Sequence, residues 1–159
     1  MLQLSSYTYK LPGIRQNDFY AELDTITYGQ TLNPELVNST PLEGKSDNVF
    51  AGTKNENSFV IYLYQPFKSF FKIKILTKGQ TVEKNNTLEV SCSFELSFWS
   101  FMMFFVILLF GVSSALINHN YILSVIIGLI IFFVYAMFVL SRYKINLMAV
   151  NDFMSGFMK

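Results

Sequence analysis

Catalysis usually needs a base, a nucleophile or a metal held within mutual reach, and this chain offers few residues of those kinds. Its one histidine, His119, lies between two long apolar segments, and its one cysteine, Cys92, precedes both of them. A Cys-His pair would have to join residues across the first apolar segment, and two such residues are too few for a metal site. We therefore expect no catalytic residue, no metal and no cofactor, and we interpret Cys92 as a small buried thiol in a strand.

Other patterns that carry chemistry are weak. Asp18, Glu22 and Asp24 cluster near one end of a predicted helix, where acidic side chains usually form a solvated face that complements the helix dipole. The eight glycines are scattered without the spacing of a phosphate-binding loop. The formal net charge is +1, and no clustered basic face indicates a nucleic-acid partner. The sequence thus predicts a protein that is not an enzyme and does not bind nucleic acid.

The strongest signal is an uncharged stretch of 46 residues, 96–141, between Glu95 and Arg142. A bilayer core about 30 Å thick needs about 20 apolar residues in a helix, so this stretch is long enough for two passes. We predict transmembrane helices at 97–117 and 121–141, joined by the polar turn 118–120. So short a turn permits only antiparallel neighbours.

The positions of the positive charges predict the orientation of this hairpin. Basic residues flank the hairpin on both sides and are absent from the turn, so the positive-inside rule places both chain ends in the cytoplasm. We expect localisation in the inner membrane. Aromatic rings near the expected interfaces predict three anchors: Trp99, Tyr121 and Tyr143. Basic side chains before the hairpin are candidates for contact with anionic lipid headgroups: Lys68, Lys72, Lys74 and Lys78.

Small residues recur at a spacing of four in each predicted pass, at Gly111 and Ala115 and again at Ser124 and Gly128. Small side chains let two helix backbones approach closely. They either pack the two helices of one hairpin against each other or form a dimerisation face, and the sequence leaves both interpretations open. No Asp, Glu, Lys or Arg lies within the span, which counts against a transporter.

The segment 1–95 predicts a cytoplasmic α+β domain with a small antiparallel sheet. Apolar and polar residues alternate over 88–96, which is typical of a half-buried strand, and 71–75 alternates likewise. We expect Lys78-Gly79-Gln80, followed by Asn85-Asn86, to separate these two strands, and residues 49–53 to pair with 59–64. A first strand is expected at 7–11 and then a short helix capped by Asn17 or Asp18, with 29–46 as a loop.

After the hairpin, apolar residues recur at helical spacing, which predicts an amphipathic C-terminal helix within 142–159. Its apolar positions are Leu147, Val150, Met154 and Phe157. The helix is expected either to pack back on the sheet or to lie along the membrane surface. Because the last strand of the domain ends only one or two residues before the hairpin, the sheet must sit close to the bilayer.

The run Phe50-Ala-Gly-Thr-Lys-Asn-Glu-Asn-Ser-Phe59 resembles a family of short, uncharacterised bacterial membrane proteins. Those proteins carry a strand pair with a Phe-x-Gly and an Asn-x-Phe motif, and a later strand runs directly into an aromatic-rich membrane hairpin, as at 88–106 here. The resemblance covers most of the chain from about Tyr7 and implies no assigned activity. Where the family has an Arg-Asn-Ser-Phe stretch between strands, this chain has Gln65-Pro-Phe-Lys-Ser-Phe70.

Together these patterns favour an integral membrane protein whose cytoplasmic domain binds a protein or lipid partner without catalysis. The alternative is a self-assembling membrane protein of the holin or immunity type, which would use the small-residue faces for homo-oligomerisation. The sequence does not decide whether the sheet closes into a barrel or stays open.

Overall fold

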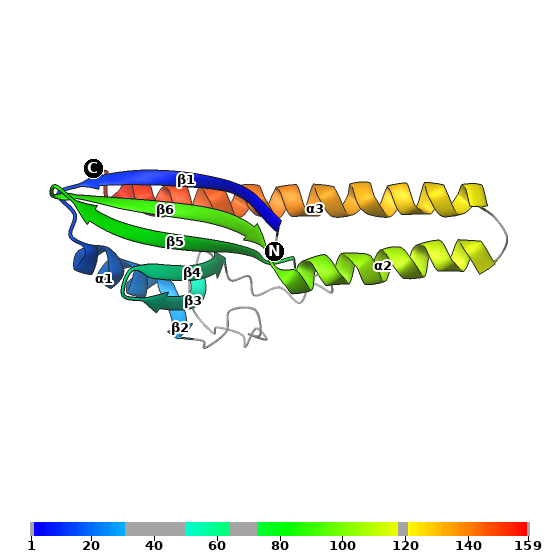
Figure 1. Cartoon of the computed structure of the whole chain (residues 1–159), viewed down its shortest axis with the longest axis horizontal. Helices are drawn as coiled ribbons and strands as arrows, with labels where there is room; N and C mark the ends of the chain where they lie inside the picture. The colour runs from blue at the N-terminus through cyan, green and yellow to red at the C-terminus, as the bar shows by residue number, and fades with distance from the viewer. Residues whose placement is uncertain (1, 31–49, 64–72, 118–120, 159) are drawn as a thin grey trace.

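The computed structural model describes the backbone at residues 2–30, 50–63, 73–117 and 121–158, and the side chains of these except 28–30 and 114–116. It is an elongated α+β molecule in which one of two long helices extends from the end of the sheet, and the other runs beside that helix and back along the sheet (Figure 1). The elements in chain order are β1 (Leu2–Pro12), α1 (Gln16–Ile26), β2 (Thr27–Gln30), β3 (Phe50–Asn55), β4 (Ser58–Leu63), β5 (Ile75–Lys84), β6 (Thr87–Leu96), α2 (Phe98–Ile117) and α3 (Tyr121–Gly156).

The sheet is open, with the strand order β1-β6-β5-β4-β3-β2. Five of its strands pair antiparallel, and β2 joins the edge of β3 in parallel. The predicted antiparallel sheet is therefore confirmed, and the question of a barrel is settled in favour of an open sheet. The parallel strand β2 was not predicted, because its first residues continue directly from α1 and show no alternation.

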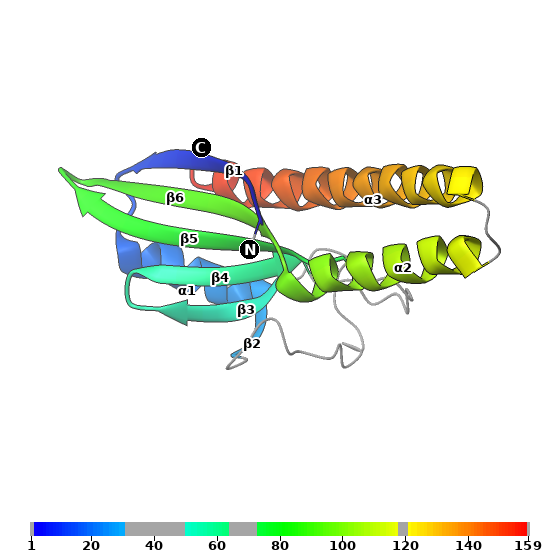
Figure 2. The same cartoon turned by 45° about the vertical axis from the view of Figure 1, so that its right-hand side comes forward.

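Alternation in β6 identifies the face that forms the core. The inward residues of this strand are all buried, as predicted: Leu88, Val90, Cys92, Phe94 and Leu96. Helix α1 and the C-terminal part of α3 cover this face, with Phe19, Val150 and Met154 inside the same apolar cluster (Figure 2). Burial raises the pKa of the Cys92 thiol to about 12, so the thiol stays protonated at neutral pH, as expected of a structural cysteine.

Three local predictions were wrong. Helix α1 begins at Gln16 with Arg15 as its N-cap, and neither Asn17 nor Asp18 caps it; Asp18 lies in the first turn, where its carboxylate faces the positive end of the helix dipole. Gln30 and Gly29, predicted as loop, end β2, while the rest of that predicted loop lies outside the described residues. The third concerns β5, which begins only at Ile75, so that Ile73 and Lys74 of the predicted strand 71–75 precede it. This strand also continues to Lys84 through Lys78-Gly79-Gln80, which was predicted as a turn.

The chain reverses between β5 and β6 only at Asn85 and Asn86, whose φ angles are 49° and 60°. A two-residue hairpin turn with both residues at positive φ matches the right-handed twist of the strands, and asparagine tolerates this region better than most residues. Gly79 has another role. It lies opposite Phe59 in the register of β4 and β5, and a Cβ atom built at Gly79 would lie 2.0 Å from Cζ of the Phe59 ring.

Helix α3 joins two elements that the sequence analysis separated. We predicted a membrane helix ending at Ser141 and a C-terminal helix from Arg142, but a single helix of 36 residues runs through both. Between Ser141 and Asn146 the chain has neither glycine nor proline to end the helix. The predicted apolar stripe packs on the sheet, since Val150 and Met154 are buried there and Leu147 and Phe157 pack beside them.

The close fit of Gly79 and Phe59 predicts the effect of adding a methyl group. We expect Gly79→Ala to lower the free energy of unfolding by about 1–3 kcal/mol, because the new Cβ atom would overlap the buried ring. Thermal unfolding of the full chain in detergent would measure the loss. Gly156→Ala is the control, since a Cβ atom there meets no atom within 4 Å. Unchanged stability of Gly79→Ala would mean that the ring does not lie over this glycine.

Candidate membrane interface

Helix α3 has two halves with different surroundings. Its C-terminal half lies on the sheet, with Val139, Asn146, Val150 and Met154 buried at intervals of seven, four and four residues. Its N-terminal half lies beside α2 and extends beyond the sheet (Figures 1 and 2). There the apolar side chains are exposed on several sides of the helix, including Ile122 at 77%, Val125 at 63% and Phe133 at 63%.

Within the described part of the chain, one helix is long and apolar enough to cross a membrane, judged by length and composition, and that helix is α3. Its most apolar 18-residue window has a mean hydropathy of 2.9, and 11% of that window is buried. The core helix of a soluble protein would be mostly covered, whereas this window is mostly uncovered. The shorter apolar helix Phe98–Ser113, within α2, lies beside it.

The two helices pack closely at the predicted small residues. A Cβ atom at Gly111 of α2 would lie 2.5 Å from Cδ1 of Ile131 and 3.2 Å from Cγ2 of Ile127, both on α3. A Cβ atom at Gly128 of α3 would lie 3.6 Å from Cγ2 of Val112 on α2. Ser124 is buried as well, at 5% exposure, whereas the side chain of Ala115 lies outside the described part. Gly111 and Gly128 therefore lie where α2 and α3 pack against each other.

Hydrogen bonds join the helix pair to the sheet where β6 leads into α2. The Ser97 backbone N–H donates to the Lys74 carbonyl oxygen at 3.1 Å, and the Lys74 backbone N–H donates to Oγ of Ser100 at 2.9 Å. Asn146, buried on α3, donates from Nδ2 to the Ile75 carbonyl oxygen at 2.9 Å. These bonds hold the end of the sheet against both helices, so the two parts form one connected body.

The predicted anchors lie in different places. Trp99 lies in the first turn of α2 and is 55% exposed, and Tyr121 begins α3 and is 67% exposed. Tyr143 instead lies over the sheet, where its hydroxyl donates to Oγ of Ser5 at 2.8 Å and lies 3.1 Å from the Tyr7 hydroxyl. Its ring packs edge-on against Phe94. Tyr143 therefore makes its contacts with the sheet and ties α3 to β1.

Tyr135 was missed by the sequence analysis. Its hydroxyl donates to the Ser100 carbonyl oxygen at 2.9 Å, and its ring stacks on Phe104 with the centroids 4.4 Å apart. It lies level with the first turns of α2 and two turns before Tyr143. A tyrosine inside an apolar run was a signal that the polar end of the ring needed a partner, but the partner, a backbone carbonyl of another helix, was not visible in the sequence.

Two of the four lysines predicted to meet lipid headgroups, Lys68 and Lys72, lie outside the described residues. The Nζ atom of Lys74 lies 5.0 Å from the centroid of the Tyr62 ring. Lys78 forms an ion pair with Glu95, with Nζ and Oε2 2.7 Å apart. Both lysines lie on the sheet face opposite the buried core, which also carries Leu76 and Tyr62.

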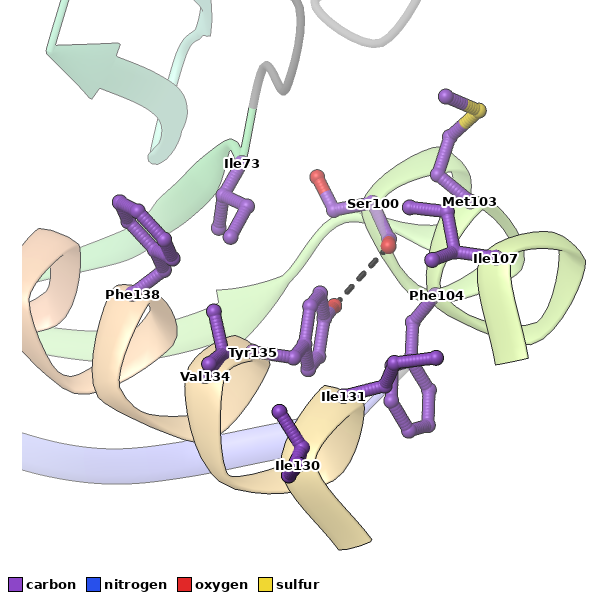
Figure 3. Close-up of a pocket in the computed structure, with 10 residues that line it drawn as sticks. All are labelled: Ile73, Ser100, Met103, Phe104, Ile107, Ile130, Ile131, Val134, Tyr135 and Phe138. Carbon is purple, nitrogen blue, oxygen red and sulfur yellow. Dashed lines mark hydrogen bonds between the residues drawn. The ribbon is translucent and has the colours of Figure 1, made fainter. Parts of the chain in front are cut away.

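A cavity of about 210 Å³ opens between α2 and α3 near the end of the sheet. Its wall is formed by apolar side chains of both helices, by Ile73, which precedes β5, and by Ser100 and Tyr135 (Figure 3). A second, polar pocket lies at the far end of the sheet among Gln16, Asn57 and Glu83. Among the described residues no group of three or more His, Cys, Asp or Glu side chains is placed to hold a metal ion.

No family model, curated protein or solved structure matches this chain. The resemblance to uncharacterised bacterial membrane proteins therefore stays a prediction. What the molecule itself provides is a sheet joined by hydrogen bonds to an uncovered apolar helix pair.

The packing at Gly111 yields a prediction that separates its two interpretations. We expect Gly111→Leu to destabilise the chain by about 1–3 kcal/mol, because the added side chain would push α2 away from Ile131. Gly128→Ala is the matched control and should stay near wild-type stability, since its new contact at 3.6 Å is ordinary packing. Thermal unfolding and light scattering in detergent would measure stability and mass. If Gly111→Leu kept its stability but changed from oligomer to monomer, the dimerisation face would be correct.

Proposed function

We propose that the chain is a membrane-anchored binding module without enzymatic activity. In this proposal α2 and α3 cross the inner membrane as a hairpin, and the sheet with α1 lies at the cytoplasmic surface and binds a protein or lipid partner. The observation that carries the proposal is helix α3, a single helix that is packed on the sheet over one half and apolar and uncovered over the other.

Exposed apolar surface of this extent is costly in water and favourable in hydrocarbon. The 20 residues of α2 would span about 30 Å, which is the thickness of a bilayer core. A continuous helix pairs the backbone groups of its interior within itself, as hydrocarbon requires, and both α2 and α3 are continuous. These lengths support two crossings. The apolar segment of α2, Phe98–Ser113, is shorter than the apolar helix α3.

The orientation rests on the charges around the sheet. Lys74, Lys78, Arg142 and Lys144 all lie on the sheet side of the helix pair, whereas the sequence between the two helices, 118–120, which lies outside the described residues, contains no Lys or Arg. Positive charge is retained on the cytoplasmic side of the inner membrane, so this distribution supports cytoplasmic chain ends.

The binding role rests on what the sheet exposes. Helices α1 and α3 cover one face, and the other face of β1, β6 and β5 presents exposed polar side chains such as Thr8, Lys10 and Gln80. None of these groups forms a pair of nucleophile and base in the described structure. A polar, rigid surface held at a fixed height above a bilayer suits recognition of a partner better than catalysis.

Native mass spectrometry of the protein, extracted in mild detergent at near-native expression, tests this function. We expect a foreign protein in stoichiometric amount or a defined retained lipid. A clean homo-oligomer with nothing else bound would contradict the binding module and favour the self-assembling, holin-like or immunity-type alternative. Gly128→Ala should pack like the wild type and is extracted in parallel as a control. A species that appears in only one of the two preparations is an artefact of extraction.

A further inference from the structure

The cavity between α2 and α3 has a wall that favours hydrocarbon. Among the described residues that line it none is charged, and the two polar ones, Ser100 and Tyr135, are already engaged. The Tyr135 hydroxyl donates to the Ser100 carbonyl oxygen, and Oγ of Ser100 accepts from the Lys74 backbone N–H. An apolar cavity of about 150 Å³ in another protein stays dry and binds benzene, because water finds too few partners there. At about 210 Å³, this cavity is larger still.

The cavity opens on the outer surface of the helix pair. Val134 and Phe138 on α3 belong to its wall and are 48% and 56% exposed, and Met103 on α2 is 48% exposed (Figure 3). The same side chains thus face the inside of the cavity and the surroundings of the helices. If the helices cross a bilayer, the surroundings that reach the mouth of the cavity are lipid acyl chains.

The dimensions exclude a helix as the occupant. A helix with its side chains is about 10–12 Å in diameter, which is too wide for a space of this volume, whereas a hydrocarbon chain is narrow and flexible. We propose that this cavity binds the acyl chain of a membrane phospholipid, which enters between Val134 and Met103 and ends against Ile73 and Ser100. The proposal rests on the proposed function, because it requires the helix pair to be in a bilayer.

Photolabelling of the full chain tests the proposal directly. The protein is reconstituted in vesicles of phosphatidylethanolamine and phosphatidylglycerol that contain a phospholipid with a photoreactive diazirine in one acyl chain. After irradiation, mass spectrometry of peptides locates the labelled residues. We expect stronger labelling of the cavity residues Ile107 and Val134 than of Leu109 and Val125, which are exposed on the same helices outside the cavity.

A variant that fills the cavity provides the second readout. Val134→Phe should reduce labelling of Ile107 by about tenfold, which corresponds to roughly 1.4 kcal/mol of lost binding free energy. Val125→Phe, at a position that is 63% exposed outside the cavity, should leave that labelling unchanged. Equal labelling inside and outside the cavity in the wild type, or no effect of Val134→Phe, would overturn the acyl-chain site and leave membrane insertion intact. Absence of label from both helices would overturn membrane insertion as well.

Discussion

The arrangement of the molecule depends on how helix α3 is held. A helix of 36 residues is about 54 Å long, and nothing in its sequence interrupts it before Gly156. Burial of Val150 and Met154 in the apolar cluster on the sheet fixes the direction of its C-terminal half. The N-terminal half must then continue past the edge of the sheet, where the described residues provide only α2 as a neighbour. Its remaining apolar surface is largely uncovered within the described structure, and the proposed membrane location rests on that exposure.

The junction between sheet and helices is polar, although apolar surfaces lie on both sides of it. Asn146 and Ser97 are buried there at 3% and 0% exposure. The Asn146 side chain donates to the carbonyl oxygen of Ile75, the first residue of β5, and the Ser97 backbone N–H donates to the carbonyl oxygen of Lys74, just before β5. Backbone carbonyl groups at the end of a strand need partners when helices cover them. By supplying those partners, the junction joins two kinds of packing without a flexible linker, so a partner bound to the sheet would be held in a fixed orientation to the helices.

Much of this fold was predictable from local pattern. The alternation of Leu88 to Leu96 identified β6 and its buried face, and the two uncharged apolar runs located α2 and the start of α3 within one residue. These predictions succeeded because burial on one face or on all faces leaves a direct trace in the sequence. The turn predicted at Gly79 was wrong because glycine is typical both of a turn and of a close approach between side chain and backbone. Only the position of Phe59 on another strand distinguishes the two.

The candidate site was less accessible to sequence reasoning. Gly111 and Gly128 were identified as packing residues, but whether they face the partner helix or a second copy depended on the register of α2 against α3. The cavity was not predicted at all, since its wall combines side chains of both helices with Ile73, which is distant in sequence from most of the wall. The continuity of α3 was missed because the charged residues from Arg142 onward marked a change of environment, and that change did not end the helix.

The depth of Trp99, the single tryptophan of the chain, tests most directly whether the helix pair lies in a bilayer. Fluorescence quenching would be measured in vesicles whose lipids carry bromine at different depths, for the wild type and for a chain with Trp99→Phe and Phe110→Trp. Phe110 is 76% exposed on α2 and lies about 16 Å further along the helix. The account predicts strongest quenching by shallow bromines for Trp99 and by deep bromines for the second chain. Quenching of both chains by aqueous iodide, with no response to brominated lipid, would contradict it.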